Sequence, residues 1–161
     1  RNEIISKLSD KFDNNCLIMV DYIEHGEELY GVLSSVCKNK KVYFIKGEVP
    51  VEDRDKVKKL MESSKDVVCI AISKIFSTGI SIKNLHYIVF ASGGKAKVKI
   101  IQSIGRGIRK AEDKDNVQIW DITSSCKFAK RHLGARKKFY KEANYPYNIE
   151  KINYENPYTR R

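Results

Sequence analysis

The stretch Val67-Val-Cys-Ile-Ala-Ile72 is apolar at every position, and this property decides the fold class. A strand with one face in water alternates polar and apolar residues, whereas a strand of a parallel sheet is covered on both faces and is continuously apolar. Four more short runs have a similar β-rich character: 16–20, 41–45, 86–91 and 117–122. The sequence therefore predicts a buried, mostly parallel sheet.

Stretches long enough for helices separate most of these runs, at residues 24–37, 50–63 and 97–109. The first contains an apolar stripe at helical spacing, formed by Leu29, Val32, Leu33 and Val36. The order strand, helix, strand, helix, strand, strand, helix, strand predicts an α/β fold with right-handed crossovers and helices flanking the sheet. Ligands of such sheets bind at the carboxyl ends of the strands, so the loops there are expected to carry the function.

The end of the chain has a different composition. A basic helix is predicted at about 126–142, and the tyrosine-rich tail after it is a candidate for a short strand docking on the domain. We expect residues 1–125 to form one lobe and residues 126–161 to form a helix and tail packed on it. Side chains expected to anchor the helix are Phe128, Leu133, Phe139 and Tyr140. Its cations fall around much of the circumference: Lys127, Lys130, Arg131, Arg136, Lys137, Lys138 and Lys141.

The composition excludes several classes of protein. With 42% hydrophobic residues the chain can form a core, so intrinsic disorder is not expected. Its longest apolar runs are strand-sized, so we expect no membrane span. The formal net charge is +11, with 31 Lys and Arg against 20 Asp and Glu, and most of the excess lies in the last quarter. This charge suits a solvated surface or a polyanion partner, and does not decide between them.

The four cysteines are widely spaced, with no CxxC pair and no neighbouring His cluster. This pattern argues against a zinc site and favours a reducing cytoplasm. Cys16 and Cys69 lie in apolar runs and are expected to be buried, inert thiols. The chain shows no signal peptide and begins with Arg rather than Met, so we expect a cytoplasmic fragment of a longer protein.

A search for a phosphate-binding loop gives a negative result. Ser92-Gly93-Gly94-Lys95-Ala96 lacks the first Gly of GxxxxGK[ST] and has no Ser or Thr after the Lys, so it is not a Walker A loop. These glycines suit a flexible turn between strand and helix better than a ligand contact. No acidic pair closes an apolar strand to hold magnesium, and we expect no metal site in this chain.

The most informative window is Gln102-Ser-Ile-Gly105-Arg106-Gly-Ile-Arg109. On a helix, Gln102, Arg106 and Arg109 share one face. Gly105 makes the helix thin where a ligand must approach, although a glycine inside a helix costs about 1 kcal/mol. Two guanidinium groups one turn apart form a fork for a phosphate. Taken alone, the window also suits a solvated basic helix face.

The window resembles motif VI of superfamily 2 helicases, QxxGRxxR. Three further elements resemble family motifs in the right order: 17–26 is similar to motif IV, 43–54 to the next strand with its Gly turn and helix Arg, and 72–82 to motif V. The resemblance covers about 16–123. Phrases such as Phe76-Ser-Thr-Gly-Ile-Ser81 resemble the UvsW type of phage ATP-dependent DNA helicases, and this resemblance implies the cytoplasm of a bacterium or of a phage-infected host.

The resemblance implies a RecA-like, P-loop NTPase-like second lobe, with ATP in a cleft against a first lobe. Arg106 and Arg109 would be arginine fingers that reach the γ-phosphate, and Gln102 would hydrogen-bond near it. Gly105 and Gly79 would allow close approach to the nucleotide. Ser81 stands where many relatives have an Asp on the ATP ribose, so that contact would lose its charge.

The resemblance also implies contacts to the DNA backbone. Ser73, at the motif V Ser or Thr position, would bind a phosphate of the tracked strand, although capping the following turn explains it equally well. Lys46, Gly47 and a motif IV loop at His25 are further candidates, with His25 expected as an exposed loop histidine and not a catalyst. On the basic helix, the candidates are Lys130, Arg131 and Lys137.

These observations predict the C-terminal motor lobe of an ATP-dependent superfamily 2 DNA helicase or translocase, acting in recombination, repair or replication-fork processing. Its partners would be branched or forked DNA, read without sequence preference, and the N-terminal RecA-like lobe of the same protein. ATP and Mg²⁺ would be held mainly by that lobe, so the isolated fragment should be inactive and bind no cofactor tightly. Two rival functions are an autonomous nucleic-acid-binding module without ATP chemistry and a restriction or remodelling translocase on duplex DNA.

Overall fold

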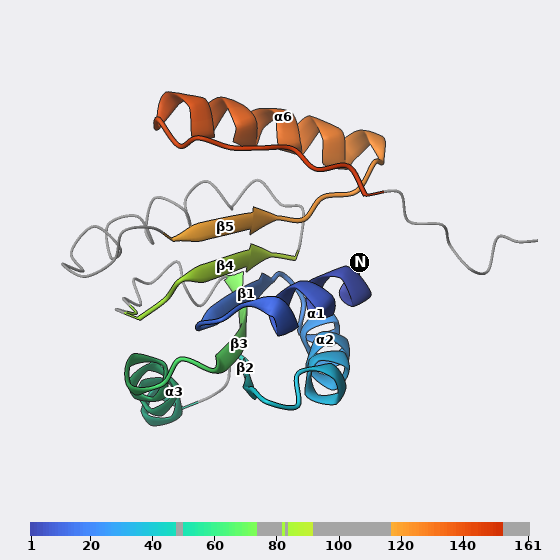
Figure 1. The fold of residues 1–161 in the computed structure, drawn as a ribbon. Helices are drawn as coiled ribbons and strands as arrows, with labels where there is room; N and C mark the ends of the chain where they lie inside the picture. Colours follow the sequence, from blue (N-terminus) through green and yellow to red (C-terminus); the bar gives the residue numbers. More distant parts are fainter. Residues whose placement is uncertain (48–49, 74–81, 83, 92–116, 153–161) are drawn as a thin grey trace, which may run out of the picture.

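The computed structural model describes residues 1–47, 50–73, 82, 84–91 and 117–152, which form a five-stranded parallel sheet (Figure 1). The strands are β1 (Cys16–Val20), β2 (Lys41–Ile45), β3 (Val67–Ile72), β4 (Tyr87–Phe90) and β5 (Gln118–Asp121). Their order in the sheet is β2-β3-β1-β4-β5, and every neighbouring pair is parallel. The α/β fold with a parallel sheet is therefore confirmed.

Four helices are described: α1 (Asn2–Lys11), α2 (Ile23–Val36), α3 (Val51–Ser63) and α6 (Lys127–Glu142). The last three match predicted helices, whereas no element was predicted before residue 16, so α1 is an addition. The signal for it was present: Ile5, Leu8 and Phe12 recur at spacings of three and four, and Lys7 pairs with Glu3 one turn earlier. The helix predicted at 97–109 lies outside the described residues.

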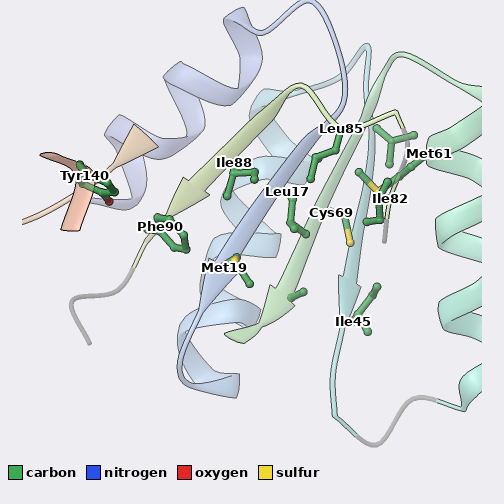
Figure 2. Close-up of a cluster of buried hydrophobic side chains, with 12 residues drawn as sticks. Leu17, Met19, Ile45, Met61, Cys69, Ile82, Leu85, Ile88, Phe90 and Tyr140 are labelled. Atoms are coloured by element: carbon green, nitrogen blue, oxygen red, sulfur yellow. The ribbon is translucent and has the colours of Figure 1, made fainter. Parts of the chain in front are cut away.

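The sheet is buried on both faces, as the continuous apolar runs require. On one face α1 and α2 cover a core that includes Ile5, Ile18 and Leu33. On the other face Met61 of α3 and Tyr140 of α6 belong to one buried cluster with Leu17, Phe90 and other side chains of the sheet (Figure 2). All five residues of β1 are buried because this strand lies in the middle of the sheet.

The apolar stripe predicted on α2 is only partly correct. Leu29 and Leu33 are fully buried, but Val36 is 40% exposed, and Cys37 just after the helix takes the buried position instead. Gly26 lies one turn before Leu29, where a Cβ atom would come 2.2 Å from the Phe44 ring. A glycine at this position therefore lets α2 approach β2 closely.

Asn15, immediately before β1, organises the amino ends of the strands. It is fully buried, and its Oδ1 accepts a hydrogen bond from the Val67 backbone N–H at 3.0 Å. Its Nδ2 lies within hydrogen-bond distance of the carbonyl oxygens of Met61, Ser64 and Asn84. One neutral side chain thus ties the end of α3 to β1 and β3.

The segment after α6 does not form the predicted strand within its described part. Residues 145–152 have no regular secondary structure and run back alongside α6 (Figure 1). The Tyr145 ring lies 6.4 Å from Phe139 and the Tyr147 ring 6.0 Å from Tyr140, so these tail tyrosines pack on the helix as expected. Among the described residues, no helix is both long and apolar enough to cross a membrane.

Candidate nucleic-acid and nucleotide interface

Four of the predicted DNA contacts follow neighbouring strands at one edge of the sheet. Because all strands are parallel, their carboxyl ends meet there. Lys46 and Gly47 follow β2, Ser73 follows β3, and His25 lies in the first turn of α2 after β1. The order β2-β3-β1 therefore brings these residues to adjacent positions along the edge.

His25 is not the exposed loop residue that the sequence suggested, because α2 begins two residues before it. The side chain is half-buried, and its Nε2 lies 2.9 Å from Asn2 Oδ1 in α1. Burial, and then the positive charge of Arg1, lower the pKa of His25 below its ordinary value. This shift favours the neutral imidazole, which forms hydrogen bonds without carrying charge.

Lys46 has an acidic partner at this edge. Its Nζ lies 2.5 Å from Glu27 Oε1 and 5.6 Å from the centre of the Phe44 ring. A groove of about 570 Å³ between α2 and β2 is lined by these three residues together with Tyr30, Val42 and Tyr43. A phosphate bound by Lys46 would have to compete with the Glu27 carboxylate.

Ser73 and Gly47 differ in how accessible they are. Ser73 is only 8% exposed, at the point where β3 ends. Gly47 is exposed, and the space around its Cα is open, since a Cβ atom there would meet nothing within 4 Å. A backbone contact at Gly47 is therefore sterically open, whereas Ser73 lies largely beneath its neighbours.

The predicted nucleotide contacts lie outside the described residues. They are Gly79, Ser81, Gln102, Gly105, Arg106 and Arg109. Within the described part of the chain, no three His, Cys, Asp or Glu side chains come close enough to hold a metal ion.

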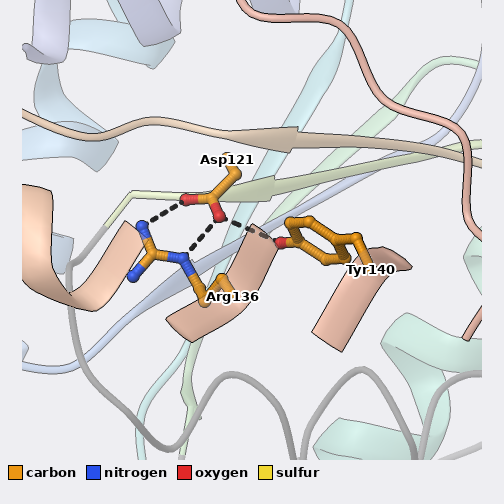
Figure 3. Close-up of polar contacts among 3 residues, drawn as sticks. All are labelled: Asp121, Arg136 and Tyr140. Carbon is orange, nitrogen blue, oxygen red and sulfur yellow. Dashed lines mark hydrogen bonds and ion pairs between the residues drawn. The ribbon is translucent and has the colours of Figure 1, made fainter. Parts of the chain in front are cut away.

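Arg136 on α6 corrects the picture of a helix with cations available around much of its circumference. Its side chain is 1% exposed and forms two bonds to the Asp121 carboxylate, Nε to Oδ2 at 2.5 Å and Nη2 to Oδ1 at 3.0 Å (Figure 3). The Tyr140 hydroxyl donates to Asp121 Oδ2 at 2.9 Å. Burial, and then the Asp121 charge, raise the pKa of Tyr140 above its ordinary value. Arg136 therefore attaches α6 to β5 and is not free to bind DNA.

The remaining cations of α6 face outward. Lys130 and Arg131 are exposed, and Lys137 is half-buried at the flank of the helix. Of the predicted anchors, Phe139 and Tyr140 pack in the core and Leu133 is half-buried, but Phe128 is 74% exposed, so that part of the prediction is wrong. The two groups of predicted DNA contacts are separated, since β2 and β3 lie at one side of the sheet and α6 adjoins β5 at the other (Figure 1).

Sequence reasoning missed Asp121 and Asn15. Asp121 is the single acid in the apolar run 117–122, and Arg136 and Tyr140 are spaced by one helical turn, so the pattern held a signal for a buried pair. Asn15 gave no such signal, because its partners are mostly backbone groups far away in the sequence.

Comparison with known proteins gives one consistent result. A family model described as "Helicase conserved C-terminal domain" matches residues 1–111. The chain is 36% identical over 142 residues to "ATP-dependent DNA helicase uvsW" of Enterobacteria phage T4, covering 86% of this chain and 28% of that protein. It thus spans little more than a quarter of that relative's length.

Solved structures agree with the sequence comparison. The crystal structure of T4 UvsW matches 88% of this chain and 32% of that one, with a TM-score of 0.71 and 31% identity. The C-terminal domain of the DEAD-box protein Dbp5 matches 88% of this chain and 78% of its own, with a TM-score of 0.64 and 19% identity. The second likeness concerns the fold alone.

Proposed function

The chain belongs to the helicase conserved C-terminal domain family, and from this premise we propose that it is the C-terminal motor lobe of an ATP-dependent DNA helicase. The observation that carries the proposal is the 36% identity to the T4 UvsW helicase, which extends over 86% of the chain. The activity would belong to a longer protein, in which an N-terminal RecA-like lobe completes the motor. Its task would lie in recombination, repair or processing of replication forks.

In this proposal, Arg106 and Arg109 place positive charge on the γ-phosphate of ATP bound mainly by the first lobe. Such charge stabilises the transferring phosphoryl group, and arginine fingers contribute roughly 10³ to 10⁵ in rate in related phosphoryl-transfer enzymes. Gln102 would link the two lobes near the γ-phosphate. Gly79 and Gly105 would allow close approach, and Ser81 would offer a hydroxyl to the ribose.

The proposed DNA contacts are sequence-independent. The exposed cations Lys130 and Arg131, with Lys137 at the flank, would bind phosphates from α6. At the carboxyl edge of the sheet, the space beside the Gly47 Cα would let a phosphate approach, and Lys46 would bind phosphate in exchange for Glu27. His25 and Ser73 would contribute hydrogen bonds there rather than charge. Forked or branched DNA is the proposed substrate.

The ATP site is tested in the full-length protein. DNA-stimulated ATP hydrolysis by Arg106→Ala and Arg109→Ala should fall by about 10³ or more if these residues are fingers. Lys59→Ala is a matched control, because Lys59 is an exposed cation on α3 far from the proposed site in sequence. Normal ATPase in both Arg variants would reject the finger assignment. ATP hydrolysis by the purified 161-residue chain itself would reject the proposal that the first lobe is required.

Unwinding is tested separately from ATP hydrolysis. On a forked substrate, the full-length protein should separate the strands only when ATP is present. Movement along duplex DNA without strand separation would instead support a restriction or remodelling translocase. Tight DNA binding without any DNA-stimulated ATPase would support an autonomous nucleic-acid-binding module.

A further inference from the structure

The first two turns of α6 carry a group of cations that the fold itself does not use. Lys127, Lys130 and Arg131 are all exposed. They are spaced three and four residues apart, so they share the outward ridge of the helix. Among the described residues none of the three forms an ion pair, in contrast to Arg136 two turns later. Their charges are therefore available to a partner.

These cations also stand at the end of α6 where the helix disfavours them. The amino end of a helix carries the positive pole of its dipole, so Lys and Arg there cost stability and acidic residues would add it. The first turn of α6 contains no acidic residue, and no side chain caps the helix at Cys126. The local sequence is thus arranged against helix stability and in favour of attracting an anion.

Phe128 stands within this group and is 74% exposed. On a helix it neighbours Arg131 three residues later and lies next to Lys127. The packing of α6 does not need it, because Phe139 and Tyr140 hold the helix on the core. The ring therefore presents a flat apolar face beside Lys127 and Arg131, at the flank of the helix away from Lys130.

The later turns of α6 attach the helix to the sheet. Arg136 and Tyr140, on the opposite side of α6, bind the Asp121 carboxylate at the end of β5 (Figure 3). These contacts fix the position of α6 relative to β5, and the binding of an anion at the amino end would offset the unfavourable charges there.

We propose that Lys127, Phe128 and Arg131 form a binding surface for single-stranded DNA, with the two cations on phosphates and the Phe128 ring stacked on a base. The inference rests on the proposed function, in which the lobe acts on DNA. Single strands offer both a dense negative backbone and free base faces, whereas in a duplex the base faces are already stacked. An acidic protein segment would match the charges but has no need of a flat ring beside them.

The decisive experiment compares Phe128→Leu with the unmodified 161-residue chain by fluorescence anisotropy on an oligo-dT strand of about 12 nucleotides, within the site sizes of single-strand binding folds. Leucine keeps an apolar side chain but has no aromatic face. We expect binding to weaken by about 5- to 150-fold, the range for losing one stacked base, with duplex affinity unchanged. Phe128→Trp should retain the affinity, and its indole fluorescence should be quenched by the strand.

Two further arms complete the test. Arg131→Ala should reduce the slope of log affinity against log salt by about 0.7, as expected for one lost contact to a single strand, whereas Lys59→Ala on α3 should leave it unchanged. Because Phe128 is exposed, circular dichroism and the thermal midpoint should be the same for all variants.

Equal affinity of Phe128→Leu and the unmodified chain for oligo-dT would overturn the proposal. So would a poly-glutamate peptide that binds as tightly as the strand and with the same dependence on Phe128, since the partner would then be an acidic protein. Loss of ATPase in Arg106→Ala combined with unchanged strand binding in Phe128→Leu would reject this surface and leave the motor assignment standing. Normal ATPase in Arg106→Ala with weakened strand binding in Phe128→Leu would support this surface and reject the role of Arg106 in ATP hydrolysis.

Discussion

Two buried polar clusters in this lobe are built from opposite chemistry. In the Asn15 cluster, the neutral side chains of Asn15 and Asn84 bond to the backbone groups of Met61, Ser64 and Val67. In the Asp121 cluster, formed by Asp121, Arg136 and Tyr140, the hydrogen bonds that join the three are between side chains, and two of the groups are charged (Figure 3).

The difference follows from what each cluster joins. The Asn15 cluster joins main-chain ends inside the sheet core, where backbone groups need partners and a charge would be costly. The Asp121 cluster joins a whole helix to the rim of the sheet, where Asp121 keeps 12% of its side chain exposed. A paired charge is tolerated there, and the pairing fixes α6 relative to β5. The first cluster serves the fold, and the second places a surface.

The largest effect is expected for Asn15→Asp. The new carboxylate would face three carbonyl oxygens without hydrogens to donate, so burial should raise its pKa well above 3.9. The proton is then held more tightly in the folded state than in the unfolded chain. Stability should therefore fall as the pH rises above about 4, with a loss of about 4 kcal/mol at pH 7 by urea unfolding.

Asn14→Asp is the matched control for that variant. Asn14 is half-buried, and its Oδ1 accepts a hydrogen bond from the Asn15 N–H, a role that a carboxylate can also fill. We expect a change within about 0.5 kcal/mol. A similar loss in both variants, or a loss in Asn15→Asp that does not depend on pH, would contradict the account of the Asn15 cluster.

Arg136→Met should have the next largest effect. It keeps the volume of the side-chain stem but leaves the Asp121 carboxylate largely buried without its cation, which typically costs about 3 to 5 kcal/mol. The double variant Asp121→Asn with Arg136→Met removes both charges and should recover part of that loss in thermal unfolding. The single variant Asp121→Asn completes the comparison. If the loss of stability in the double variant equalled the sum of the losses in the two single variants, the coupling between the two residues would be disproved.

Tyr140→Phe should cost less, about 1.5 kcal/mol, because one donor to a charged acceptor is lost and the ring stays packed. Burial and the Asp121 charge raise the pKa of Tyr140, so the folded state holds the phenol neutral. Above pH 10 the phenol ionises more readily in the unfolded chain, and stability is lost. The difference between Tyr140→Phe and the unmodified chain should therefore shrink as the pH rises through this range.

Tyr22→Phe provides the comparison for this pH dependence, since Tyr22 is 71% exposed. Denaturant titrations at a series of pH values should show parallel curves for this variant and the unmodified chain. A difference for Tyr140→Phe that stays constant above pH 10 would show that the phenol is not held neutral by the fold.

The smallest effect on stability is expected for the thiols of Cys16, beside the Asn15 cluster, and Cys126, at the start of α6, which should differ in how fast they are modified. Cys16 directly follows Asn15 and is fully buried, and this burial raises the pKa of its thiol. Cys126 directly precedes α6 and is exposed, and a hydrogen bond with Ser124 lowers the pKa of its thiol. At pH 8, a thiol reagent should modify Cys126 at once and Cys16 only after unfolding. Cys126→Ser should abolish the fast phase without a measurable change in stability, and a fast phase that survives this change would refute the assignment.

The predictions for the strands succeeded because their apolar runs are local signals that burial on both faces requires. β1, β2 and β3 occur at the residues expected, and the helix predicted at about 126–142 is α6, Lys127–Glu142. The predictions were wrong for side chains whose burial depends on the residues packed around them. Val36 and Phe128 suit a buried stripe by type, yet both are exposed, while Cys37 and Tyr140 are buried.

The sequence by itself determined the fold class, the family and the identity of the residues proposed to reach ATP, because each depends on residue types at fixed spacing along the chain. Only the tertiary structure decided which cations of α6 are free. Lys130 and Arg136 are both cations of the same predicted basic helix. They differ because the sheet places the Asp121 carboxylate beside Arg136, whereas Lys130 is exposed. Burial and pairing depend on segments far apart in the chain, so the charge of a residue alone does not tell whether it holds the fold together or faces a partner.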